Sequence, residues 1–275
     1  MNSNYYKKII KQFEMQLTQE HLSSNTIRSY LFVVYRFYNL YTEINETNVL
    51  AFQHYLERHY SATSANLRII AFNRFLSFIG KIHLKLERIK FSQSSFLDKM
   101  ISYEEYEQFR MHLSSQEEKK WFYIVWVLAS TGVRISELVQ FQKEDIVRGF
   151  IDVRAKGNKI RRVFIPQSLQ IDISLWLDSQ GILSGPVFRN RSGRAISIRG
   201  ISKGLERKAK EFGIDPHIVH PHAFRHLFAK KFLERNGDIT LLADLLGHES
   251  LDTTKIYLRR SSDEQKEIIN RIVEW

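Results

Sequence analysis

The sequence predicts a mainly α-helical fold of two domains, with one small β-hairpin in the second domain. Most of the chain carries apolar residues at the three-and-four spacing of amphipathic helices, and only 12 glycines and 4 prolines interrupt its 275 residues. Residues 150–165 instead show the alternating, β-branched pattern of paired strands. A length of 275 residues is enough for two domains of ordinary size. We therefore expect a helical N-terminal domain followed by an α+β domain.

The N-terminal domain is predicted to span residues 1–80 and to be all-helical. Residues 5–78 contain four segments with helical periodicity, as Val33 and Phe37 illustrate in the second of them. Serine and asparagine residues suited to helix capping precede these segments, and Gly80 ends the last one.

Residues 81–99 are predicted to be a basic linker between the domains, because helical periodicity fades there and cations outnumber acidic residues. The cations considered for contact with a polyanion are Lys81, Lys85, Arg88 and Lys90. Two interpretations stay open: a solvated connector, or a strap that lies along a phosphate backbone.

Residues 100–275 are predicted to form the second domain. Helical patterns cover residues 103–113 and 117–130. Alternating patterns at residues 150–154 and 162–165 predict the two strands of the hairpin. Further helices are expected at residues 169–177, 199–212, 222–235, 239–246, 253–259 and 264–275.

Charge and cysteine content limit the possible functions. The 41 lysine and arginine residues exceed the 30 aspartate and glutamate residues by 11, and both predicted domains share the excess, which predicts a polyanionic partner. The absence of cysteine excludes disulfides, thiolate zinc sites, iron–sulfur clusters and cysteine nucleophiles.

The start of the chain lacks the apolar stretch of a signal peptide, and the most apolar segment, residues 121–129, is too short to span a bilayer. A soluble, cytoplasmic protein is expected.

The second domain concentrates residues suited to an anionic, phosphate-like transition state. Arg134 follows a glycine, and Glu137 lies three residues later on the same helical face, where it can hold the guanidinium. A surface ion pair is the alternative for these two residues. Lys156 lies in the predicted hairpin turn, where it is either solvated or able to reach a ligand and donate a proton.

A second group of polar residues surrounds His222. Arg225 follows one helical turn later, so both side chains can face one ligand. His222 and His226 have the spacing of a metalloprotease pair, but that motif needs a glutamate directly after the first histidine, and Ala223 stands there. A zinc site is therefore disfavoured.

His248 and Tyr257 complete the set of candidate residues. His248 directly follows a glycine that ends a predicted helix. A tyrosine hydroxyl is a poor nucleophile unless cations and hydrogen bonds stabilise its phenolate. The alternative for Tyr257 is a packed ring, which is the usual role of the 12 tyrosines in such a chain.

In their order and spacing, the segments that contain these candidate residues resemble the signatures of the tyrosine recombinases. This family includes the phage integrases and the Xer-type recombinases. The matching segments are residues 131–138 (TGVRISEL), 156–159 (KGNK), 222–226 (HAFRH), 246–248 (LGH) and 253–257 (TTKIY). The resemblance covers the whole chain. It implies a simple two-domain enzyme with a core DNA-binding domain at residues 1–80 and a catalytic domain at residues 100–275.

The resemblance implies that Tyr257 attacks a DNA phosphodiester, forms a 3′-phosphotyrosyl bond and frees a 5′-hydroxyl. Arg134 and Arg225 are implied to hold the non-bridging oxygens, and Glu137 to orient the first of these arginines.

The remaining roles implied by the resemblance concern protons. His222 and His248 are implied to handle hydrogen bonding and proton transfer, and Lys156 to protonate the leaving 5′ oxygen. The resemblance implies no metal and no other cofactor.

The expected partner is double-stranded DNA, bound by a homotetramer in the synaptic complex, with an accessory protein left open. Residues 264–275 are expected to dock either on a neighbouring protomer or on their own domain. Two alternative functions stay open: a relaxase that nicks plasmid DNA for transfer, and a non-catalytic DNA-binding protein on the same fold.

Overall fold

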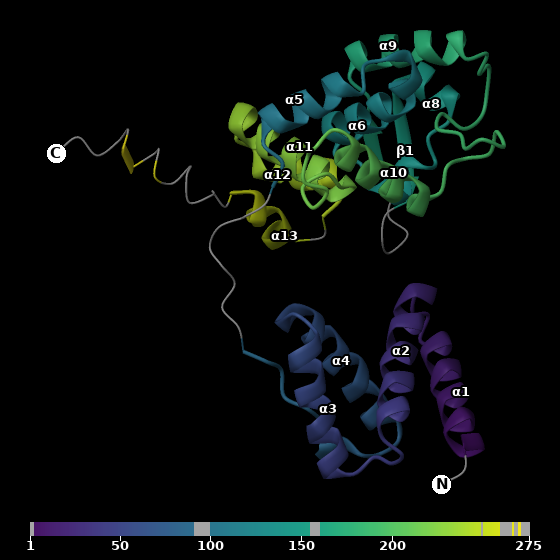
Figure 1. The fold of residues 1–275 in the computed structure, drawn as a ribbon, viewed down its shortest axis with the longest axis vertical. Coiled ribbons are helices and arrows are strands. Elements are labelled where there is room, and N and C mark those ends of the chain that lie inside the picture. The colour runs from purple at the N-terminus through teal and green to yellow at the C-terminus, as the bar shows by residue number, and fades with distance from the viewer. Residues whose placement is uncertain are drawn as a thin grey trace. The chain divides into compact units, whose positions relative to one another are not determined.

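The computed structural model describes residues 3–90, 100–154, 160–248, 250–258, 266 and 269–270. The chain divides into two compact units, Met1–Gln93 and Ser94–Trp275 (Figure 1). Each unit has its own hydrophobic core.

The N-terminal unit contains the four helices that the sequence predicts. They are α1 (Ser3–Gln19), α2 (Ser24–Leu40), α3 (Glu46–His59) and α4 (Ala62–Phe78). Ser23, Asn45 and Ser61 each accept a hydrogen bond from a backbone N–H at a helix start, so the predicted polar caps are present. Phenylalanine rings such as Phe37 and Phe72, whose centroids lie 4.8 Å apart, fill the core.

Residues 81–90 pack on the N-terminal unit, which corrects the prediction that the linker begins at residue 81. Leu86 is 9% exposed within the N-terminal core. The side-chain amide of Asn73 donates to the Leu86 carbonyl and accepts from the Leu86 N–H, both at 2.8 Å. Asn66 binds the backbone of Ile89 in the same way, at 2.9 and 2.8 Å.

The spacing of these two asparagines explains the fit. Asn66 and Asn73 are seven positions apart on the helix, a rise of about 10.5 Å. Leu86 and Ile89 are three positions apart in an extended segment, a rise of about 10 Å, so the two spacings match. The segment therefore behaves like a strand paired with α4 through side-chain amides. The rest of the predicted linker, residues 91–99, lies outside the described residues.

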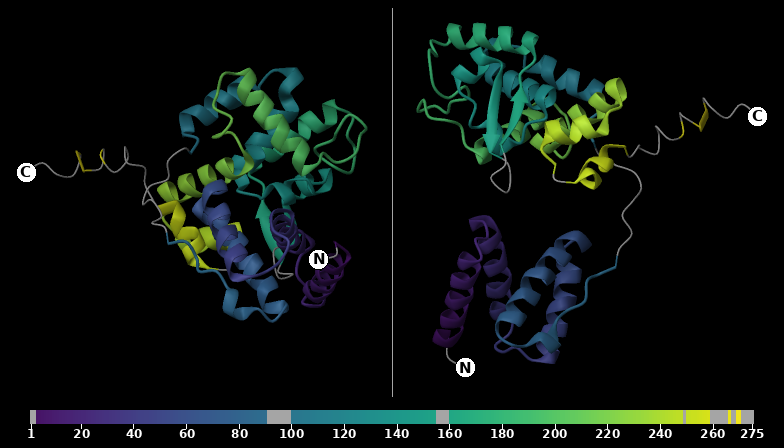
Figure 2. Two further views of the ribbon diagram at one scale, coloured as in Figure 1. Left: turned by 60° about the horizontal axis from the view of Figure 1, so that its bottom comes forward. Right: turned by 180° about the vertical axis from the view of Figure 1, so that it is seen from behind.

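The second unit consists of helices around one hairpin. Its helices are α5 (Tyr103–His112), α6 (Lys119–Thr131), α7 (Ile135–Leu138), α8 (Lys143–Arg148), α9 (Gln167–Ser179), α10 (Ile198–Glu211), α11 (Pro221–Asn236), α12 (Ile239–Leu246) and α13 (Leu251–Lys255). The strands β1 (Phe150–Arg154) and β2 (Ile160–Phe164) pair antiparallel, with Phe150 opposite Phe164 (Figure 2). The largely buried helix α6 runs through the middle of the unit and packs against α11 (Figure 1).

Two details of the second unit differ from the sequence expectation. The short helices α7 and α8 were not expected as separate elements. The helix expected at residues 253–259 is divided into α13 and a 3₁₀ turn, Ile256–Leu258. The expected helix at residues 264–275 lies outside the described residues, apart from residues 266, 269 and 270. Among the described helices, none is both long and apolar enough to cross a membrane.

Candidate active site

The site begins where α6 ends and the chain turns into α7. Gly132 ends α6 with a left-handed φ of 60°, and a Cβ atom at this position would lie only 2.4 Å from Cδ1 of Phe228. Glycine is therefore required both by the backbone conformation and by the packing. The turn makes Arg134 the N-cap residue of α7 and leaves its side chain half-buried.

Glu137 lies at the base of the site and binds two arginines. The carboxylate, 4% exposed, accepts from the Arg134 backbone N–H at 2.8 Å and from its guanidinium at 3.2 Å. The guanidinium of Arg161 donates to the same carboxylate at 2.6 Å. The i, i+3 contact expected between Arg134 and Glu137 is thus present, but Glu137 is buried and is not part of a surface ion pair.

Arg161 is a site residue that the sequence reasoning missed. It points inward from β2 and is 8% exposed. The available signal was the alternation of the strand, in which residues 161 and 163 face the interior and Arg162 faces outward, where it pairs with Asp152.

Three arginine side chains bind backbone carbonyls at the C-terminal end of α12. Helix ends leave backbone carbonyls without helical partners and carry partial negative charge, which favours cations. Three successive carbonyls here each accept from a different guanidinium: Leu245 from Arg161 at 2.6 Å, Leu246 from Arg225 at 2.7 Å and Gly247 from Arg134 at 3.3 Å. Gly247 ends the helix with a φ of 64°, and its missing Cβ leaves room for the Arg161 side chain.

Arg225 is the most deeply buried of the three, at 3% exposure. It also donates to the Gly132 carbonyl at 2.6 Å. Burial, followed by the positive charge of Arg134, lowers the pKa of Arg225 to about 10, so it stays protonated at neutral pH. Among the described residues, Arg225 takes part in no ion pair, and all of its acceptors are neutral. The three guanidinium groups with one carboxylate leave an excess of two positive charges.

Tyr257 lies in the 3₁₀ turn after α13 and is 8% exposed. It lies close to Arg225, and its side chain counteracts the lowering of the Arg225 pKa that burial causes. The His226 ring meets the Tyr257 ring edge-on at 4.8 Å, and the His248 ring lies nearly parallel to it at 6.0 Å. The structure therefore brings Tyr257 together with Arg225 and two histidines.

The four histidines around α11 and α12 have different environments. His220 is the N-cap of α11 and accepts from the Ala223 N–H at 3.2 Å. His222 reaches solvent, and partial burial followed by the charges of Arg225 and Arg134 lowers its pKa. Burial, followed by neighbouring positive charge, lowers the pKa of both His226 and His248 to about 4.

One predicted site residue is not described, and the four predicted linker cations belong to the N-terminal unit. Lys156 lies outside the described residues. Lys81 donates to the Ile44 carbonyl at 2.5 Å within the N-terminal unit, while Lys85, Arg88 and Lys90 are exposed on that unit. Within the described ranges, no three histidine or carboxylate side chains form a cluster that could hold a metal ion.

A basic stripe on α10 was also missed at the sequence level. Arg199, Lys203 and Arg207 are exposed at i, i+4 and i+8 on the face opposite the buried residues of the helix. This spacing places all three cations on one side, where they can follow a polyanion. The signal in the sequence is the four-residue spacing of these cations.

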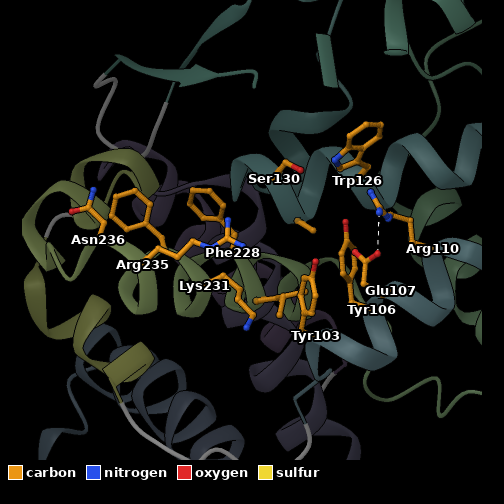
Figure 3. Close-up of a pocket in the computed structure, with 13 residues that line it drawn as sticks. Tyr103, Tyr106, Glu107, Arg110, Trp126, Ser130, Phe228, Lys231, Arg235 and Asn236 are labelled. Atoms are coloured by element: carbon orange, nitrogen blue, oxygen red, sulfur yellow. Dashed lines mark hydrogen bonds and ion pairs between the residues drawn. The ribbon is translucent and has the colours of Figure 1, made fainter. Parts of the chain in front are cut away.

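A separate hollow of about 590 Å³ lies between α5, α6 and α11 (Figure 3). Aromatic and basic side chains line it, including Tyr106, Trp126 and Lys231. Phe228 belongs to its wall and also packs against Gly132. None of the arginines of the site lines this hollow.

Comparisons with known proteins identify the family of the chain. The model of the phage integrase family matches residues 99–264. Tyrosine recombinase XerA from Thermococcus kodakarensis is 32% identical over 96% of this chain and 97% of its own length. The XerA from Pyrococcus furiosus is also 32% identical, over 96% of this chain and 93% of its own length.

Solved structures show the same fold. A crystal structure of XerA recombinase matches with a TM-score of 0.56 at 24% identity, over 100% of both chains. A lambda integrase dimer bound to a core site matches with a TM-score of 0.73 at 18% identity, over 91% of this chain and 94% of that chain. From the family match and the full-length relatives together, the chain belongs to the phage integrase family of tyrosine recombinases, enzymes that transfer DNA strands.

Proposed function

We propose that this protein is a site-specific recombinase that cleaves and rejoins DNA through a 3′-phosphotyrosyl bond at Tyr257. The observation that carries the proposal is Arg225, a buried guanidinium that binds only neutral acceptors, one of which is the His248 ring that lies nearly parallel to Tyr257. A buried charge without a counter-ion is costly. A phosphodiester supplies the missing negative charge directly beside the nucleophile.

The proposed cleavage step exchanges one phosphodiester for another. The phenol oxygen of Tyr257 bonds to phosphorus, and the bond from phosphorus to the departing 5′ oxygen breaks. The phenol proton passes to His248 or His222, and Lys156 protonates the departing oxygen. The energy of the broken bond is kept in the protein–DNA bond, so a 5′-hydroxyl of a second strand reverses the step without ATP.

Arg134 and Arg225 supply the electrostatic stabilisation. Both are held by carbonyls at the end of α12, and Glu137 fixes Arg134 from the other side. Their geometry is therefore set before substrate arrives, which is the condition for strong stabilisation of developing charge. Arg161 holds the Glu137 carboxylate and is a positioning residue.

The proposed partner is double-stranded DNA. The net charge of +11 and the α10 stripe supply the positive charge that a phosphate backbone requires. A lambda integrase dimer was solved on a core site, and a XerH recombinase on its difH substrate. By analogy, the N-terminal unit with its attached residues 81–90 forms the core DNA-binding domain, the chain from residue 100 onward is catalytic, and four copies assemble in the synaptic complex.

The relaxase and the non-catalytic regulator are not favoured. The full-length curated relatives are named as tyrosine recombinases, and a pure DNA binder has no need for a tyrosine held against a buried arginine.

Recombination between two sites tests this function. Protein is incubated with fragmented DNA from its source and denatured, and the strands that stay attached are sequenced. The recovered sequence is then placed twice on one plasmid. Exchange between the two copies supports a recombinase, whereas nicking without exchange at a recovered site supports a relaxase.

A further inference from the structure

The two ring nitrogens of His248 have different partners. Nε2 lies 3.1 Å from Nη2 of Arg225, and a guanidinium can only donate, so Nε2 is the acceptor. Nδ1 lies 2.8 Å from Oγ1 of Thr254. A neutral imidazole carries its proton on the nitrogen that does not accept, so Nδ1–H donates to the Thr254 hydroxyl. The low pKa of His248, about 4, agrees with a neutral ring.

Thr254 is placed to hold this ring. It lies on α13, three residues before Tyr257, and is 0% exposed, whereas its neighbour Thr253 is exposed. Because the position is dry, water is not available to replace the hydroxyl as a partner. The branched Cβ also restricts the side chain to few rotamers, which limits the directions in which the oxygen can point.

We propose that Thr254 is a positioning residue that keeps Nε2 of His248 turned towards Arg225 and the place of the reacting phosphate. The inference rests on the proposed function and assigns a role to a residue outside the predicted catalytic set. Thr254 suits this role because its hydroxyl can both accept and donate a hydrogen bond.

The two-way hydrogen bonding of the Thr254 hydroxyl matters when the protonation of the His248 ring changes. With the proton on Nδ1, or with both ring nitrogens protonated, Nδ1–H donates to Oγ1. If the proton instead resides on Nε2, the Thr254 hydroxyl donates to Nδ1. The Thr254 hydroxyl can therefore hold Nδ1 of His248 in each protonation state, including those in which a proton on Nε2 breaks the contact with Nη2 of Arg225.

The test compares Thr254→Val, which keeps the shape but lacks the oxygen, with Thr254→Ser, which keeps the oxygen. Thr253→Val is the matched control on the exposed neighbour. The first readout needs no DNA: protein with ¹⁵N-labelled histidine is examined by NMR, and the His248 signal is assigned with His248→Gln. We expect a slowly exchanging Nδ1–H signal in wild type, Thr254→Ser and Thr253→Val, and its loss in Thr254→Val.

The second readout is the rate of covalent adduct formation on the DNA recovered by capture, with DNA affinity measured in parallel. Thr254→Val is expected to slow the adduct about 10- to 100-fold, as loss of a residue that orients a functional histidine does. Affinity and the melting temperature should stay close to wild type, and Thr254→Ser should restore the rate.

An Nδ1–H signal that persists in Thr254→Val, or its absence from wild type, would overturn the positioning role. So would an unchanged adduct rate in Thr254→Val. If wild type forms no adduct while the NMR signals behave as expected, the proposed function fails and the contact between Thr254 and His248 stands.

Discussion

Arg225 is the residue on which the proposed chemistry depends most, because its charge is buried beside Tyr257 without a carboxylate partner among the described residues. Replacing it by lysine keeps a charge but loses the planar fork that reaches several acceptors at once. We expect Arg225→Lys to slow adduct formation by about 100-fold or more, in the range seen when one stabilising donor is removed.

DNA affinity should change much less in this variant, since in the proposed complex Arg225 is one of many cations near the phosphate backbone. Single-turnover cleavage and equilibrium binding on the same DNA measure the two effects. Arg235→Ala, in the last turn of α11, is the control. A loss of affinity equal to the loss of rate would make Arg225 a binding contact instead.

The lowered pKa values of His226 and His248 predict how the stability of the fold depends on pH. Their pKa values in the folded protein are about 4, against an ordinary value of 6.5. Between these values the unfolded chain binds more protons than the folded one, so the free energy of unfolding falls as pH is lowered from 6.5 to 4. Each residue contributes a slope of at most about 1.4 kcal/mol per pH unit.

Urea unfolding at a series of pH values checks this dependence. His226→Gln removes one of the two groups and should make the decline shallower in that window. An equally steep decline in His226→Gln would show that His226 does not contribute to the loss.

At the residue scale, the sequence predicted the i, i+3 contact of Arg134 and Glu137, because both lie on one short helical face. It did not predict Arg161, since Arg161 and Arg162 are chemically identical neighbours. Only the strand register shows which of the two faces inward to Glu137. Long-range contacts of this kind have no signature in local spacing.

At the scale of elements, the paired asparagines of α4 attach residues 85–90 to the N-terminal unit. Asn73→Leu removes both side-chain bonds to Leu86 and leaves a buried N–H and carbonyl without partners. We expect a loss of about 1–3 kcal/mol in the free energy of unfolding. Faster tryptic cleavage at Lys85 and Arg88 should accompany it.

Asn25→Leu is the matched control, because Asn25 is exposed on α2. Unfolding in urea and limited proteolysis measure both effects. Equal behaviour of the two variants would mean that the asparagine bonds do not hold the segment.

Element prediction succeeded where periodicity extends over several turns, as in α2 and α12, whose C-terminal end at Leu246 was predicted. It failed at α7 and α8, which have 4 and 6 residues and therefore too few turns to show a period. The attachment of residues 81–90 was also not predictable, since it depends on amide side chains two helical turns apart.

At the scale of the whole molecule, the excess of 11 positive charges predicts that DNA affinity falls steeply with salt. The logarithm of the affinity should fall against the logarithm of salt concentration with a slope of about −0.9 for each phosphate neutralised. Lys203→Gln, in the α10 stripe, should make the slope shallower by about one unit and weaken binding similarly on all sequences.

Lys210→Gln is the control on the same helix, because Lys210 already pairs with Glu206 at 2.6 Å. Binding titrations at several salt concentrations measure both variants. An unchanged slope in Lys203→Gln would place the DNA path away from α10.

The most direct test of the central claim is the chemical identity of the protein–DNA bond. After covalent capture, the DNA is trimmed with nucleases and the protein is digested, and mass spectrometry locates the attached nucleotide. We predict a nucleotide joined through its 3′ phosphate to the peptide that contains Tyr257, and no adduct in Tyr257→Phe, which should still bind DNA. An adduct on another residue, or one that persists in Tyr257→Phe, would contradict the assignment of Tyr257 as the nucleophile.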